Sequence, residues 1–105
     1  GIACMSVPKA LKNTYIRSAT EKLRTLDELW ETARTSEVTP GPLKPLKDFC
    51  HRLAGSGGSY GFPALGDAAR ALELAILNEQ DATALESACK TFRGKLVELS
   101  ETPTD

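Results

Sequence analysis

The sequence predicts an all-α protein, an antiparallel four-helix bundle with an up-down-up-down topology. Apolar residues recur at spacings of three and four along four segments of the chain, which places them on one face of a helix in each segment. Proline and glycine mark two of the breaks between segments, and most connections are short, as they are between antiparallel neighbours in a bundle. Alternation of apolar and polar residues, which is typical of strands, is scarce.

Length and charge limit the function classes. The chain has 105 residues, enough for one modest domain. We expect a helical domain over residues 7–101, a polar tail over residues 102–105, and an N-terminal tail over residues 1–6 whose "GIAC" resembles a cloning remnant. A net charge of −1 argues against a general nucleic-acid binder, which usually shows a basic excess. No apolar run approaches the roughly 20 residues that span a bilayer, and a signal-peptide pattern is absent, so we expect a cytoplasmic domain that binds neither nucleic acid nor membrane.

The first helical segment is expected from about Val7 to Thr35. Its apolar stripe consists of Ile16, Ala19, Leu23, Leu26, Trp30 and Ala33. Ser6 is a candidate N-cap, and Pro8 suits a first turn. At 1.5 Å per residue, about 28 residues would span roughly 42 Å, more than the other helices. The segment is therefore either one long helix or two helices with a break near Asn13 or Thr20.

Three further helices complete the predicted bundle. The second should begin near Leu43, after the proline-rich stretch "TSEVTPGPLKP". Pro63 suits the first turn of the third helix, which should end around residues 78–80, and Asp81 is a good N-cap for the fourth. The stripes of these three helices are Leu46, Cys50, Leu53, Gly57 and Tyr60; Leu65, Ala69, Leu72 and Ile76; and Leu85, Cys89, Phe92, Leu96 and Leu99. The cysteines on these stripes are predicted to be small core residues and not a disulfide framework.

The stretch "HRLAGSGGSYGF" holds the only histidine of the chain, His51, followed by four glycines. A P-loop would need a lysine directly after its glycines, and none follows until Lys90. A dinucleotide-binding fingerprint would need a third glycine where the chain has Tyr60. Leu53 and Tyr60 stay in step with the helical stripe, so we interpret the stretch as part of a helix.

On that helix His51 projects away from the apolar stripe. At 100° per residue, the residues within about 20° to 40° of it around the axis are Lys44, Lys47, Gly55 and Gly58. Cys50 lies 100° away on the core side, and Gly57 is on the core stripe, where it would let a neighbouring helix approach closely. Each interior glycine costs about 1 kcal/mol of helix propensity, a large amount against a total stability of about 5–15 kcal/mol. The pattern therefore favours a site at which another macromolecule must reach the imidazole.

An imidazole that a partner can reach is suited to phosphoryl transfer. Neutral histidine is a nucleophile at cytoplasmic pH and can hold a phosphoryl group on a ring nitrogen. Lys44, Lys47 and Arg52 could supply the cationic help that such a transfer needs. The chain has no Walker lysine and no kinase glycine loop, so we expect no ATP site of its own and a partner that brings both phosphate and metal.

The same residues resemble the histidine phosphotransfer (HPt) domains of bacterial two-component phosphorelays. The family pattern is H-x-L-x-G-[SA], then small residues, a glycine and an apolar residue, matched here by His51, Leu53, Gly55, Ser56, Gly58, Gly61 and Phe62. The resemblance implies a four-helix bundle with His51 as the phosphoacceptor on its second helix. It also implies a response-regulator receiver domain or a histidine kinase as partner, with Mg²⁺ supplied by the receiver and no cofactor of the chain's own. We expect the domain to act as a monomer.

Two further positions follow from the resemblance. The family commonly has a Gln or Glu, 22 residues after the histidine, that hydrogen-bonds the imidazole, and that position is Glu73 here. Many members carry a lysine three residues after the histidine, where this chain has Ala54. The resemblance therefore implies that a nearby cation, such as Lys47, Arg52 or Arg70, takes over phosphoryl support or receiver docking.

Two alternatives to receiver-to-receiver relay stay open. The domain could be a helical interaction module whose bare glycine face docks a partner without chemistry. It could also be phosphorylated directly by a kinase domain, as in chemotaxis kinases. We expect no metal site, because Cys50 and His51 point in different directions on a helix and no second ligand has suitable spacing.

Overall fold

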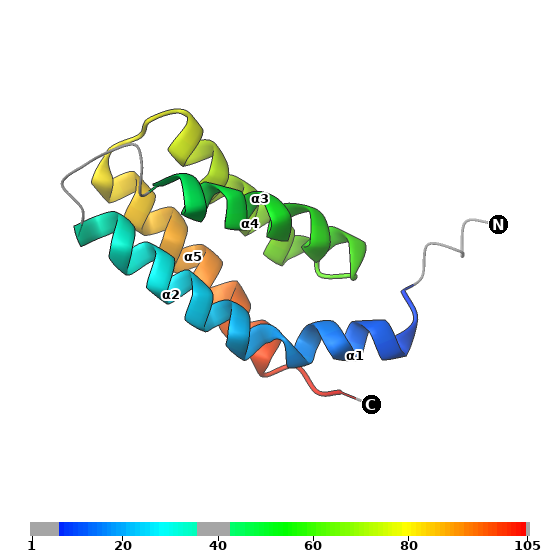
Figure 1. Ribbon diagram of the computed structural model, residues 1–105. Coiled ribbons are helices and arrows are strands. Elements are labelled where there is room, and N and C mark those ends of the chain that lie inside the picture. The colour runs from blue at the N-terminus through cyan, green and yellow to red at the C-terminus, as the bar shows by residue number, and fades with distance from the viewer. Residues whose placement is uncertain (1–6, 36–42, 105) are drawn as a thin grey trace.

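The structure, a computed structural model, describes residues 7–35 and 43–104, and every regular element in these ranges is a helix. The helices are α1 (Lys9–Arg17), α2 (Ala19–Thr35), α3 (Leu43–Ser59), α4 (Pro63–Leu77) and α5 (Ala82–Ser100). The predicted all-α class is therefore confirmed for the described residues. Figure 1 shows α3 beside α4 and α2 beside α5, and α4 also packs against α5 and α2 against α3.

The long first segment consists of two helices. The residue between them is Ser18, so the break lies between the two predicted positions, Asn13 and Thr20. The Ser18 hydroxyl donates a 2.6 Å hydrogen bond to the carbonyl of Tyr15, the kind of local side-chain bond that bends a helix. As a result α1 contacts α2 and α5 near the break and then runs beside the turn between α3 and α4, where the Lys12 ammonium lies 5.4 Å from the centroid of the Phe62 ring.

The start of α1 differs from the prediction. Pro8 has φ −55° and ψ 140°, which is an extended and not a helical conformation, so the helix begins at Lys9 and not at Val7. The candidate cap Ser6 lies outside the described residues, as do the other residues of the 1–6 tail and those of 36–42.

The remaining helix boundaries follow the sequence signals closely. Pro63 is the first residue of α4, and the helix ends at Leu77, one residue before the predicted range. Asp81 caps α5, since its carboxylate accepts a 2.9 Å hydrogen bond from the backbone N–H of Ala84. α3 begins at Leu43, as predicted.

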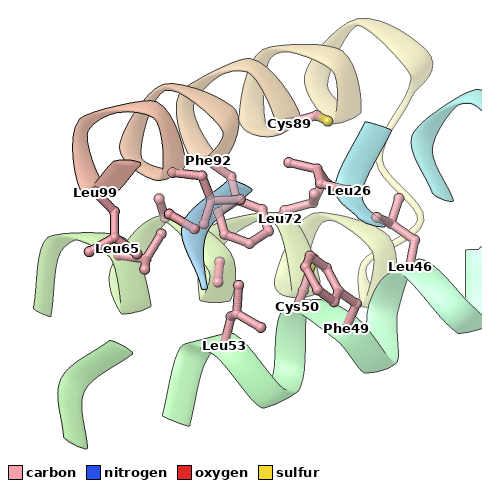
Figure 2. Close-up of a cluster of buried hydrophobic side chains, with 14 of the residues drawn as sticks. Leu26, Leu46, Phe49, Cys50, Leu53, Leu65, Leu72, Cys89, Phe92 and Leu99 are labelled. Carbon is pink, nitrogen blue, oxygen red and sulfur yellow. The ribbon is translucent and has the colours of Figure 1, made fainter. Parts of the chain in front are cut away.

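The core lies between α2, α3, α4 and α5 (Figure 2). Its largest fully buried side chains are Leu26, Leu46, Cys50, Leu72, Phe92 and Leu96, all of them on predicted stripes. Trp30 and Leu85 are only partly buried, whereas Phe49, which the stripe analysis omitted, is 4% exposed. Both described cysteines are free, and burial raises the pKa of Cys50 to about 12 and that of Cys89 to about 11, so both thiols stay protonated. None of the described helices is long and apolar enough to cross a membrane.

Candidate functional site

His51 lies on the outer face of α3. Its side chain is 74% exposed, whereas the preceding Cys50 is completely buried. This contrast agrees with the predicted 100° between them around the helix axis. The imidazole is therefore open to a large partner and does not belong to the core.

Glu73 of α4 contacts the imidazole of His51. Its Oε2 lies 2.7 Å from Nδ1 of His51, and the residue is 8% exposed. An ionised carboxylate only accepts hydrogen bonds, so Nδ1–H is the donor and Nε2 keeps its lone pair. The contact between Glu73 and the imidazole that the family resemblance implied is present, and it leaves Nε2 as the ring nitrogen available to a partner.

Two glycines keep the helix surface around His51 bare. A Cβ atom added to Gly55 or Gly58 would meet nothing within 4 Å. Both positions therefore face open space, which matches their predicted place beside the imidazole. A partner can approach His51 along α3 without meeting a side chain at either residue.

A second pair of glycines brings α3 and α4 together. A Cβ on Gly57 would lie 2.7 Å from the backbone nitrogen of Gly66, and one on Gly66 would lie 2.9 Å from the carbonyl oxygen of Ala54. The sequence predicted the close approach at Gly57 but missed Gly66 as its counterpart. The one available signal was a lone glycine inside an alanine-rich helix. This approach sets the spacing across which Glu73 reaches His51.

The four basic residues named from the sequence differ in their surroundings. Lys44 forms a 2.9 Å ion pair with Asp48, which lowers the pKa of that carboxyl. Arg52 lies over the ring of Phe49 at 5.9 Å. Arg70 is exposed on α4 and Lys47 is partly buried, and no ion pair engages either of them among the described residues.

The candidate site is an open surface. A groove of about 1040 Å³ is lined by Trp30, Leu43, Lys47, Leu77 and other residues, but neither His51 nor Glu73 lines it. The described part of the chain also contains no group of three or more His, Cys, Asp or Glu residues that could hold a metal ion.

Tyr15 of α1 is a neighbour of the site that the sequence did not single out. Its hydroxyl lies 2.8 Å from Oγ of Ser56 on α3, and its ring stacks on Tyr60 with the centroids 4.6 Å apart. No local pattern indicates a contact between residues 41 positions apart in the chain.

The tautomer of His51 offers a direct test of the Glu73 contact. Because the chain has one histidine, the imidazole ¹⁵N spectrum contains a single pair of ring signals. At alkaline pH the wild type and Glu73→Gln, which keeps an acceptor oxygen, are expected to show the Nδ1–H form. Glu73→Leu removes the acceptor and should shift the ring toward the Nε2–H form. A wild-type spectrum dominated by Nε2–H would contradict the assigned geometry.

Comparison with known protein families finds one family model that matches this chain. The family model described as "Hpt domain" matches residues 10–102, which include both His51 and Glu73. No curated protein and no solved structure shows a significant match.

Proposed function

This chain belongs to the Hpt family of histidine phosphotransfer domains, which act in phosphorelays, and from that premise we propose that His51 is its phosphoacceptor. The residue would relay a phosphoryl group between aspartates of receiver domains, or take it from a histidine kinase. One observation carries the proposal: the exposed imidazole of His51 has Nδ1 2.7 Å from the carboxylate of buried Glu73, and its Nε2 has no hydrogen-bond partner among the described residues.

The proposed transfer begins at Nε2 of His51. Its lone pair attacks the phosphorus of an aspartyl phosphate, the N–P bond forms as the O–P bond breaks, and the electrons of that bond remain on the leaving aspartate. The Nδ1 proton stays between the ring and Glu73, so the phosphorylated imidazole carries a positive charge next to a carboxylate. That attraction stabilises the phosphohistidine, and transfer to a second receiver reverses the same steps.

We propose that the positive charge that neutralises the phosphoryl oxygens comes from both the receiver domain and this chain. Phosphoryl transfer depends on positioning and on neutralising the charge of the phosphoryl oxygens. We propose that a receiver domain supplies Mg²⁺, and that the chain contributes no cofactor. Lys47 and Arg70 are the better candidates for phosphoryl support in the absence of a lysine at Ala54, because Lys44 and Arg52 already engage Asp48 and Phe49.

The same proposal includes the topology of the helix bundle, the oligomeric state and the cellular location. We propose that α2, α3, α4 and α5 form the antiparallel up-down-up-down bundle that the family uses. The domain would act as a monomer in the cytoplasm, with the receiver covering the bare face of α3.

A labelling experiment tests the function. The protein is incubated with receiver domains that carry a ³²P-labelled aspartyl phosphate, and the label on the chain is tested for stability in acid and base. We expect an acid-labile, base-stable label that mass spectrometry assigns to the peptide containing His51. Absence of label from every cognate receiver or kinase would overturn the proposal.

The same experiment separates the two alternatives. Binding of a receiver without any transfer of label would indicate an interaction module. Label that appears only with ATP and a kinase domain would indicate direct phosphorylation of the chemotaxis type.

A further inference from the structure

We propose that Tyr15 is a positioning residue that holds the glycine-rich end of α3 in place beside His51. Its hydroxyl hydrogen-bonds Oγ of Ser56 at 2.8 Å, and its ring stacks on those of Tyr60 and Phe62 with centroids 4.6 and 5.8 Å away. The proposal rests on the proposed function in one respect: a partner is taken to meet the α3 surface that contains Gly55 and Gly58.

The end of α3 needs tertiary support because its own sequence favours the helix weakly. Gly55, Gly57 and Gly58 lie within four positions, and glycine is a poor helix former. Beyond the backbone of α3 itself, a Cβ added to Gly55 or Gly58 would meet no described atom within 4 Å, so the outer face has no packing there. Three backbone hydrogen bonds close the last turn, from Tyr60 to Ser56 at 2.9 Å, from Gly61 to Gly58 at 3.2 Å and from Phe62 to Gly57 at 2.7 Å. Backbone bonds near a helix end nevertheless open more easily than those in the middle of a helix.

Two contacts support this end from different sides. On one side the backbone of Gly57 lies against Gly66 of α4. From a second direction Tyr15 of α1 contacts both Ser56 and Tyr60. Tyr15 and α4 therefore both stabilise the position of the glycine-rich end of α3.

Tyr15 is itself held firmly. It is 5% exposed, and the ammonium of Lys22 lies 4.4 Å from its ring centroid, within the range of a cation–π interaction. Burial raises the pKa of the Tyr15 hydroxyl, so it remains protonated and able to donate. The break at Ser18 gives α1 a direction of its own, and Tyr15 lies three residues before it.

The effect on phosphotransfer follows from this arrangement. A partner that binds a loosened α3 end must order it, and that ordering reduces affinity. His51 and Glu73 keep their own contact, so the transfer step within the complex is unchanged. Loss of the Tyr15 hydroxyl should therefore raise the receiver concentration needed for half-maximal rate and leave the maximal rate nearly unaltered.

Amide hydrogen exchange tests the positioning role without any phosphotransfer. Tyr15→Phe keeps the stacked ring and removes the hydroxyl, and Ser56→Ala removes its partner. Each is expected to speed exchange of the amides of residues 57–61 by roughly fivefold, the equilibrium factor of one ordinary hydrogen bond, while the amides of α5 stay unchanged. Because both variants remove the same bond, the double variant should exchange no faster than either single variant.

Tyr60→Phe is the matched control. It removes a hydroxyl from the same stack, where the described residues give that hydroxyl no hydrogen-bond partner, and should leave exchange at residues 57–61 unchanged. Unchanged exchange in Tyr15→Phe, or acceleration spread evenly over all helices, would overturn the proposal.

The kinetic measurement links the hydrogen bond to the partner. With a phosphorylated receiver as donor, Tyr15→Phe is expected to raise the half-saturating concentration about fivefold and to change the maximal rate by less than about twofold. A loss confined to the maximal rate would contradict the inference. If the wild type accepts no phosphoryl group at all, the proposed function fails, and hydrogen exchange alone still decides the role of Tyr15.

Discussion

Replacement of His51 by glutamine is expected to abolish phosphoryl acceptance, so that the label falls to the level of a sample without the protein. An amide has no nucleophilic ring nitrogen, and no other histidine is present to take its place. Glutamine is preferred to alanine because its NH₂ group can still donate to Glu73. Alanine would leave a buried carboxylate without that partner, which costs about 1–3 kcal/mol.

The fold should tolerate this change. The His51 side chain is 74% exposed, and substitutions at such positions usually alter the free energy of unfolding by less than about 0.5 kcal/mol. Urea unfolding of the variant checks this expectation. Lys90→Gln, at an exposed position of α5 outside the site, is the control and should still accept label. Equal labelling of His51→Gln and the wild type would place the phosphoacceptor elsewhere.

Replacement of Gly57 by alanine should give the second large effect, a loss of stability. The new Cβ would lie 2.7 Å from the backbone nitrogen of Gly66 and 3.1 Å from the carbonyl oxygen of Phe62, and neither backbone atom can move alone. Such overpacking costs about 1–3 kcal/mol, occasionally more, whereas alanine recovers about 1 kcal/mol of helix propensity. We expect a net loss of about 1–2 kcal/mol in the free energy of unfolding, measured by urea denaturation.

Gly58→Ala provides the contrast, because its Cβ would meet nothing within 4 Å. It should stabilise the protein by up to about 1 kcal/mol through helix propensity. The added methyl group lies on the His51 face, so receiver binding should weaken even though the fold is more stable. Equal stability of Gly57→Ala and Gly58→Ala would show that α3 and α4 do not depend on a glycine at their contact.

Local patterns in the sequence were sufficient for most of the fold. Stripes at spacings of three and four predicted the helices and most of the buried residues, and Pro63 and Asp81 marked the starts of α4 and α5. These signals depend on residues within one or two helical turns of each other, so they can be recognised in the sequence. The sequence offered a break near Asn13 or near Thr20, or one unbroken helix, and could not choose among them, because the apolar stripe runs on from Ile16 to Ala19 without interruption.

Part of the site could also be predicted from local patterns, and part depends on how the helices pack. His51 and the bare face at Gly55 and Gly58 follow from one helix and were predicted from it. The position of Glu73 came from a family resemblance, and its 2.7 Å contact with Nδ1 depends on how α3 and α4 align.

The sequence by itself determined which segments are helical, which face of each is buried, and that one histidine stands on a glycine-bare surface. Only the tertiary structure decided that Gly66 meets Gly57 and that Tyr15 reaches Ser56. Which face of a helix is buried follows from the spacing of apolar residues along that one helix. Contacts between helices depend on how far one helix is shifted and rotated against another, which is settled only when the whole core packs.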